Sequence, residues 1–299
     1  MYKDIFYIDN HIHGSFGINF NYANYDEIRY VLRELYKLNI KGICPTLVGD
    51  KDENIIRQLS YFKKIKDEQL RNIENETLII GVHLEGTFLS PEKSGIQDKN
   101  VFLKPNVSNF RKITGDFEDI IKIVTIAPEE DDGLIDYLNK KNIKTQAGHT
   151  TGATLKNCKA TTHHFNAMNS IHHRNPSIAL EGLIRDDIYI EIIADLIHLS
   201  EDAIKLVLKT KNKNKILLVS DSLPSSNSDC DIIFCGKKID KFGKDSTGTL
   251  AGSNQTLNSI CKNLLEKNIL TCEDIKLTAF DNQLDYLKLK KDEIDILLK

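Results

Sequence analysis

FYIDNHIH (residues 6–13) is an apolar run that closes on two histidines, His11 and His13, and later runs close on side chains of the same kind. These side chains are Glu85 after TLIIGVHL, His149 after IKTQAG, His163 after KATT and Asp221 after ILLVS. In a (β/α)8 barrel the carboxyl ends of the strands meet at one rim, where active sites are built. Histidines and carboxylates also hold divalent metals with positions left open for water. The pattern therefore predicts a metal-dependent site at the rim of a barrel.

Short β-rich runs alternate with longer helical patterns along the whole chain. Strands are expected near residues 5–9, 41–47, 77–84, 120–126, 143–147, 159–163, 188–194 and 215–220. Helices are expected near 25–38, 51–72, 130–141, 151–157 and 200–210, and from about 254 to the end with a break near Asp281 and Asn282. This alternation is typical of parallel strands joined by helical crossovers. The number of strands favours a closed α/β barrel of the TIM type over an open sheet, and no glycine-rich phosphate loop follows the first strand.

Two long stretches interrupt the alternation. Residues 86–118 form a connection rich in Gly, Pro, Ser and Asn, and residues 222–253 are irregular apart from a short β-like piece, IIFCGKKI. Long connections on the active rim of a barrel are often lids or binding loops. We therefore expect these loops to border the site.

Composition narrows the class of protein. The 299 residues suit one large barrel or two ordinary domains, and the net charge of −3 directs the chain to neither nucleic acid nor an anionic membrane. No apolar stretch approaches the roughly 18 residues needed to cross a bilayer, and the segment MYKDIFYIDN lacks the features of a signal peptide. The sequence thus predicts a cytoplasmic protein without a nucleic-acid or membrane partner.

Each candidate also has an ordinary structural explanation. On a strand, residues i and i+2 face the same side, so His11 and His13 could share one ion, or both could be polar loop residues. Glu85 precedes a glycine at a point where no helical pattern begins that it could cap. His149 could simply accompany a helix start capped by a threonine, and Asp221 could itself cap a helix.

Two further histidines have to be assigned. His163 and His164 are adjacent, so on a strand only one of them can face the barrel axis. His83 lies two residues before Glu85 and is expected to be a buried core histidine.

A series of longer motifs extends over residues 8–257. Taken together, they resemble the N-acetylglucosamine-6-phosphate deacetylases of the amidohydrolase superfamily. The motifs are IDNHIHG (8–14), CPTL (44–47), GVHLEGTFLSPEKSGIQ (81–97), AGHTTGAT (147–154), THHFNAMNSIHHRNP (162–176), LVSDS (218–222) and GTLAGSNQTL (248–257).

The resemblance implies a role for each strand-end residue. Glu85, His149 and His163 correspond to the principal metal ligands of the family, and Asp221 corresponds to its catalytic aspartate. His11 and His13 match the His-x-His pair that completes a second metal site in some members.

The resemblance also implies substrate contacts. Asn166 and Ala167 match backbone-amide contacts to the phosphate, and His198 matches a substrate-binding histidine. Arg174 matches an arginine that binds the sugar phosphate and can reach across a dimer interface, so a homodimer is expected. The cofactor is expected to be one or two divalent ions per chain, Zn²⁺ or Fe²⁺.

Some segments depart from the family pattern. Family members carry a small β-sandwich domain, which is expected to be absent here or reduced to about residues 229–247, leaving residues 1–299 as a single catalytic barrel. Leu196 and Ile197 also occupy the position where the family usually has a glycine before the histidine equivalent to His198. These differences affect the expected fit of the substrate more than the binding of metal.

The expected activity is therefore metal-dependent hydrolysis of the acetamide of N-acetylglucosamine 6-phosphate to glucosamine 6-phosphate and acetate. One alternative is an amidohydrolase that acts on a related N-acetyl hexosamine phosphate or on a cyclic amide. Another is a non-catalytic descendant that binds a phosphosugar. Retention of all the candidate ligands and of Asp221 argues against the second alternative, because a barrel without a reaction has no physical need for them.

Overall fold

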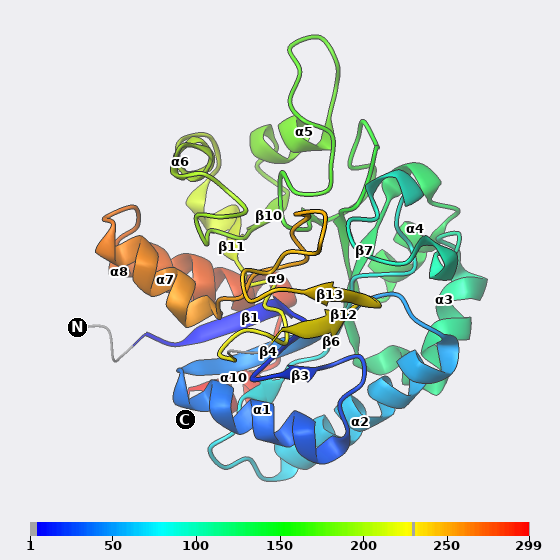
Figure 1. Cartoon of the computed structure of the whole chain (residues 1–299), viewed down its shortest axis with the longest axis vertical. Coiled ribbons are helices and arrows are strands. Elements are labelled where there is room, and N and C mark those ends of the chain that lie inside the picture. The colour runs from blue at the N-terminus through cyan, green and yellow to red at the C-terminus, as the bar shows by residue number, and fades with distance from the viewer. Residues whose placement is uncertain (1–4, 229–230, 299) are drawn as a thin grey trace.

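Eight parallel strands form a barrel in the computed structural model, which describes residues 5–228 and 231–298 (Figure 1). The strands are, in sheet order, β1 (Tyr7–Ile12), β4 (Ile40–Leu47), β6 (Val82–Leu84), β7 (Ile121–Ile126), β8 (Lys144–Ala147), β9 (Ala160–Thr161), β10 (Tyr189–Ile192) and β11 (Ile216–Leu218). A short strand, β5 (Leu78–Ile79), pairs with β4 ahead of β6. A parallel bridge between Ile12 and Ser222 joins the segment that follows the last strand to the first strand. The predicted (β/α)8 fold is confirmed.

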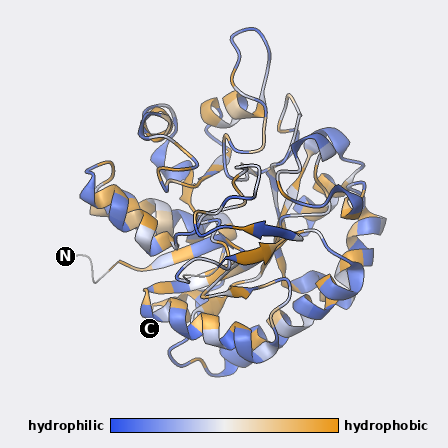
Figure 2. Ribbon diagram, in the orientation of Figure 1, coloured by the Kyte–Doolittle hydropathy of each residue, from blue (hydrophilic) through white to orange (hydrophobic). Residues whose placement is uncertain are grey.

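Helices surround the barrel and present both hydrophilic and hydrophobic residues (Figures 1 and 2). They are α1 (Tyr25–Lys37), α2 (Asp52–Arg71), α3 (Val107–Thr114), α4 (Leu134–Lys140), α5 (Ile178–Ile184), α6 (Glu201–Thr210), α7 (Leu257–Glu266), α8 (Cys272–Lys276), α9 (Asn282–Leu287) and α10 (Lys291–Leu297). Helix α1 shows why such segments fold locally: Asn24 and Glu27 form a reciprocal capping box at its start, and apolar side chains of one face are buried against the sheet. Among the described residues, no helix is long and apolar enough to span a membrane.

Three expectations about helices were wrong. Residues 151–157 form irregular turns, because the Glu129 carboxylate accepts hydrogen bonds from the Thr150 hydroxyl and from the backbone and side chain of Thr151, which holds the segment in a loop. Helix α3 lies inside the expected loop 86–118. The expected break near Asp281 is instead a π-helical turn (Leu277–Asp281) that continues into α9. That helix ends at Leu287 and is followed by Lys288, whose φ is +48°.

The C-terminal helices cover the amino ends of the barrel strands. Phe280, Tyr286, Leu287 and Leu297 pack in one buried cluster with strand residues such as Ile8. Polar side chains of α9 reach further in: the Gln283 amide donates to the Leu218 carbonyl and accepts from the Asn10 side chain. This end of the barrel is therefore filled, and the opposite rim is left for a site.

A small hairpin lies near that rim. Its strands are β12 (Ile232–Phe234) and β13 (Lys237–Ile239), and Phe234 and Ile239 pack against Val48, Ile96 and Leu223. A second hairpin, β2 (Gly14–Ser15) with β3 (Ile18–Asn19), follows β1. Residues 229–230 of the segment expected to replace the small domain lie outside the described part of the chain, and β12–β13 is the regular structure of the described remainder.

Gly86, which follows Glu85 directly, is required by packing. A Cβ atom at this position would lie 1.9 Å from the Gly49 nitrogen and 2.6 Å from the Val48 carbonyl carbon. Because both neighbours are backbone atoms in a close-packed interior, they cannot move aside. We expect Gly86→Ala to reduce the free energy of unfolding by about 3 kcal/mol, measured by urea denaturation.

The control for that substitution is Gly133→Ala. Gly133 has a φ of +85° and open space around its Cα, so alanine there tests backbone strain without a steric clash. We expect a loss of about 1 kcal/mol. Equal losses in the two variants would contradict the packing explanation for Gly86.

Candidate active site

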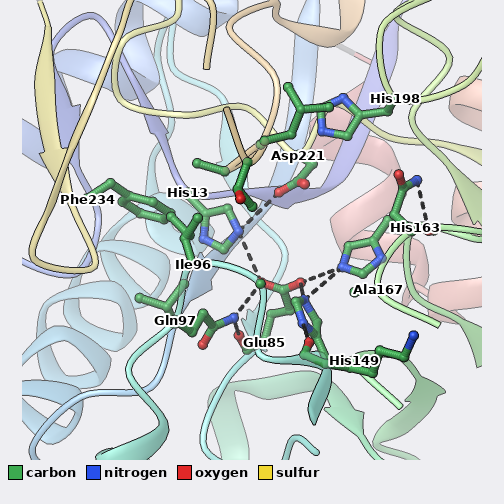
Figure 3. A pocket seen from close by; sticks show the side chains of 18 of the residues that line it. His13, Glu85, Ile96, Gln97, His149, His163, Ala167, His198, Asp221 and Phe234 are labelled. Carbon is green, nitrogen blue, oxygen red and sulfur yellow. Dashed lines mark hydrogen bonds and ion pairs between the residues drawn. The ribbon is translucent and has the colours of Figure 1, made fainter. Parts of the chain in front are cut away.

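A cavity of about 370 Å³ opens at the carboxyl end of the strands, and most of the sequence-predicted residues line it (Figure 3). Its wall combines metal-ligand side chains with loop residues from distant parts of the chain. The predicted residues that line it are His13, Glu85, His149, His163, Asn166, Ala167, His198 and Asp221. Strand ends from several parts of the barrel thus meet as the sequence predicted.

Glu85 lies at the centre of this cluster (Figure 3). Its Oε1 atom is 2.9 Å from His163 Nε2 and 3.1 Å from His149 Nε2, and its Oε2 atom is 3.2 Å from His13 Nε2. His11 Nε2 lies 3.6 Å from Oε1. Two groups of side chains can therefore each hold a metal ion, and Glu85 belongs to both of them.

The hydrogen-bonding capacity of these groups fits a cation. His149 Nε2 and His163 Nε2 lie 3.1 Å apart. Two imidazole nitrogens this close need either a proton or a metal ion between them, because their lone pairs otherwise repel. Among the described residues, His11 Nε2 and Asp221 Oδ1 are buried and make no well-aligned hydrogen bond, although they lie 3.3 Å apart. Buried polar atoms normally have a bonding partner, so this set of nitrogen and oxygen atoms suits a divalent metal ion.

Local backbone conformation directs the ligands inward. His149, His163 and Asp221 have φ values of +46°, +28° and +51°, which turn each side chain at the end of its strand. The ring of His149 is further fixed because its Nδ1 atom lies 2.6 Å from the Lys93 carbonyl, to which it can donate. That bond leaves Nε2 with the lone pair that a metal requires.

The site stabilises the ionised carboxylates. Burial favours the neutral form of Glu85, but the charge of His11 and the close approach of the His11, His13 and His149 rings outweigh it and hold the pKa of Glu85 well below its usual value. Burial also opposes ionisation of Asp221, but His11 and His13 outweigh it and lower the pKa of Asp221. Both side chains are consequently available as anions.

Asp221 and His198 occupy the same wall of the cavity (Figure 3). Asp221 Oδ1 lies 3.1 Å from His13 Nε2 and 3.3 Å from His11 Nε2. His198 Nδ1 lies 2.9 Å from Asp195 Oδ2. Burial lowers the pKa of His198, but the hydrogen bond and charge of Asp195 outweigh it and raise that pKa above its usual value. Asp195 therefore makes the ring easier to protonate.

The predicted phosphate contacts are only partly assembled. Asn166 and Ala167 line the cavity, but the Asn166 N–H already donates to the His163 carbonyl at 2.9 Å. Arg174 is exposed outside the cavity, where its guanidinium lies 2.7 Å from His173 Nε2. It belongs to the long loop that leads into α5 and projects from the barrel (Figure 1). The lysine that does line the cavity is Lys93.

Two fully buried histidines lie outside the cluster. His83 is buried, and its Nε2 atom is 2.8 Å from the Thr125 hydroxyl, as expected for a core residue. His164 is also buried, with Nδ1 2.9 Å from the Thr161 hydroxyl. Burial lowers the pKa of His164 to about 3, so its ring is neutral.

Sequence reasoning missed several residues of the site. Gln97 donates to the Glu85 carbonyl at 2.8 Å and lies 3.4 Å from Glu85 Oε2. Phe234 and Lys93 complete parts of the cavity wall. None of these three follows a predicted strand, so the strand-end pattern could not single them out, although Gln97 and Lys93 fall in the 81–97 motif.

The chain is similar to known proteins in both sequence and structure. No protein-family model matches the chain. It is 31% identical over 288 residues to N-acetylglucosamine-6-phosphate deacetylase of Bacillus subtilis (strain 168), covering 92% of this chain and 72% of the relative. The solved structure of the deacetylase of that name from Thermotoga maritima is similar, with a TM-score of 0.83, 28% identity, and coverage of 95% of this chain and 78% of that one.

A third similar protein shares the fold. It is a mutant form of N-acetyl-D-glucosamine-6-phosphate deacetylase from Mycobacterium smegmatis, solved in complex with N-acetyl-D-glucosamine-6-phosphate. The TM-score is 0.83 at 24% identity, and the match covers 95% of this chain and 77% of that one.

Proposed function

The chain belongs to the N-acetylglucosamine-6-phosphate deacetylase family, and on that premise we propose that it hydrolyses the acetamide of N-acetylglucosamine 6-phosphate to glucosamine 6-phosphate and acetate. The observation that carries this proposal is the convergence of Glu85, His149, His163 and Asp221 on one cavity. A phosphosugar is the substrate class, as the names of the similar proteins suggest.

We assign the metal ligands as follows. Glu85, His149 and His163 hold a first divalent ion, and His11 and His13 with Glu85 hold a second one. Zn²⁺ and Fe²⁺ both accept imidazole and carboxylate ligands of this kind. When bound, such an ion lowers the pKa of a water molecule and polarises the acetamide carbonyl.

Asp221 and His198 supply the remaining chemistry. Asp221 lies beside the proposed ligands and is ionised, so it can accept the proton of the attacking water and pass it to the departing amine. When its ring is protonated, His198 can donate through Nε2 to the oxygen that becomes negative, because Asp195 accepts the hydrogen bond of Nδ1 and raises the pKa of the ring.

We propose that the phosphate binds at the Ala167 end of the cavity. The Ala167 N–H has no acceptor among the described hydrogen bonds, and Lys93 contributes a positive charge to the same wall. Arg174 is exposed on a projecting loop, so it fits a role across a homodimer interface, in which the loop of one subunit reaches the cavity of the other. Light scattering of the purified protein measures this assembly.

The test of the proposed function is acetate release from a small panel of substrates. N-acetylglucosamine 6-phosphate should be turned over faster than unphosphorylated N-acetylglucosamine, because the phosphate adds charge-assisted contacts. The 6-phosphates of N-acetylgalactosamine and N-acetylmannosamine define the preferred epimer. Equal turnover of the unphosphorylated sugar would count against the phosphate site, and no acetate from any sugar in the metal-loaded protein would favour the non-catalytic alternative.

Domain organisation and location remain predictions. We propose that residues 1–299 act as one catalytic barrel, in which the β12–β13 hairpin borders the site where the family has a larger insertion. A cytoplasmic location, with no nucleic-acid or membrane partner, is likewise proposed from the sequence, and cell fractionation measures the location.

A further inference from the structure

Glu191 is a buried carboxylate that lies outside the cavity. It sits in the middle of β10 within the apolar run IYIEII (188–193), and its exposed fraction is 0%. A carboxylate removed from water needs hydrogen-bond donors to offset its lost hydration. Its two side-chain partners are Gln146 Nε2 at 2.6 Å and His11 Nδ1 at 3.3 Å. One of these partners is a proposed metal ligand.

The orientation of Gln146 is set from its other side. The Thr162 hydroxyl donates to Gln146 Oε1 at 2.9 Å, so the NH₂ group of the amide faces Glu191. The reverse orientation would place an amide oxygen 2.6 Å from a carboxylate oxygen. Gln146 therefore donates to Glu191 Oε1, and Glu191 Oε2 remains to accept a hydrogen bond from the Nδ1–H group of His11.

The consequence falls on the metal-facing nitrogen of His11. With the proton on Nδ1, Nε2 presents its lone pair, and this atom lies 3.3 Å from Asp221 Oδ1 and has no hydrogen-bond partner among the described residues. We propose that Glu191 is a positioning residue that holds the His11 imidazole in the tautomer and orientation needed to bind the second metal ion. Buried carboxylates behind metal-binding histidines commonly have this effect on ring orientation and basicity.

This inference rests on the second metal site of the proposed function. If Glu191 had a purely structural role, it would only accept the hydrogen bond of Gln146 inside the barrel. Removing its carboxylate would then lower the free energy of unfolding without weakening one metal site more than the other. The two roles differ in one measurable quantity, which is the pair of metal dissociation constants.

Glu191→Gln is the decisive substitution, because it keeps the size of the side chain. Its amide has one acceptor, whereas Gln146 and His11 both need to donate. If the amide oxygen faces Gln146, the NH₂ group faces His11 Nδ1 and favours a ring protonated on Nε2, which cannot bind metal. We expect one of the two Zn²⁺ dissociation constants to rise about 10–100-fold while the other stays unchanged.

The measurement is competition between the full-length protein and a chromophoric chelator at graded free Zn²⁺, with metal content determined by mass spectrometry. Glu76→Gln is the matched control, since Glu76 is a 5% exposed carboxylate that pairs with Arg29 and Arg33 away from the cavity. It should leave both constants unchanged.

Unchanged constants in Glu191→Gln, or two constants raised equally, would overturn the positioning role. If that variant does not fold, Glu191→Asp decides by the same criterion, and a smaller rise in one constant alone supports the role. A wild-type chain that binds a single ion would overturn the second site and this inference together. The deacetylase proposal is judged separately, by acetate release.

Discussion

Glu85→Gln is expected to remove almost all divalent metal from the purified protein, whereas the wild-type chain should carry one or two ions. Glu85 belongs to both of the groups that can hold a metal among the described residues, so one substitution weakens both. An amide offers a neutral oxygen in place of a charged one, and its NH₂ group would face imidazole nitrogens that need a cation. Metal analysis after gel filtration in metal-free buffer measures the loss.

Stability gives an independent measure of the same loss. A ligand that binds only the folded state raises the free energy of unfolding, so a chelator should lower the unfolding temperature of the wild-type protein. The chelator should have no effect on Glu85→Gln, which has no ion to lose. Glu76→Gln again serves as the control and should retain metal. Full metal content in Glu85→Gln would remove Glu85 from the ligand set.

The fold was largely predictable because barrel strands are short, apolar and separated by amphipathic helices. The expected strand 77–84 corresponds to β5 and β6, which are interrupted at Ile80 and Gly81. The expected helix 151–157 does not form because of a tertiary contact. Its start at Thr150 and Thr151 carries capping residues, but those groups bind Glu129 from another loop, and local sequence does not show that contact.

The site was predictable to the extent that its residues end strands. Glu85, His149 and Asp221 could be found in this way because a polar residue after an apolar run is conspicuous. Glu191 is the opposite case: a carboxylate in the middle of a strand, whose partners His11 and Gln146 come from distant strands. Arg174 shows a different limit, since its placement depends on a long loop whose position no strand pattern specifies.

Asp221→Asn is expected to lower kcat/KM for acetate release by about 10²–10⁴-fold while the protein keeps its metal. The carboxylate is 3.1 Å from His13 Nε2 and lines the cavity, so it is placed beside the reacting groups. An amide of the same size can no longer accept a proton from water or return it to the amine. The measurement is steady-state acetate release together with metal content on the same preparation.

Metal content decides which role of Asp221 is lost. His11 Nε2 and His13 Nε2 both approach Asp221 Oδ1, so this carboxylate could instead serve mainly as a ligand. An inactive variant with full metal content assigns proton transfer to Asp221, because the rest of the site is then intact. An inactive variant without metal assigns it to the ligand set and contradicts the prediction.

Asp274→Asn is the control for this substitution, since Asp274 caps α8 and pairs with Lys213 away from the cavity. It should keep acetate release near the wild-type rate. Retained activity in Asp221→Asn would move the proton-transfer role to another group. His198 is then the next candidate, because Asp195 raises its pKa and it shares the cavity wall with Asp221. In that case, the double variant that lacks both side chains should lose the acetate release that each single variant retains.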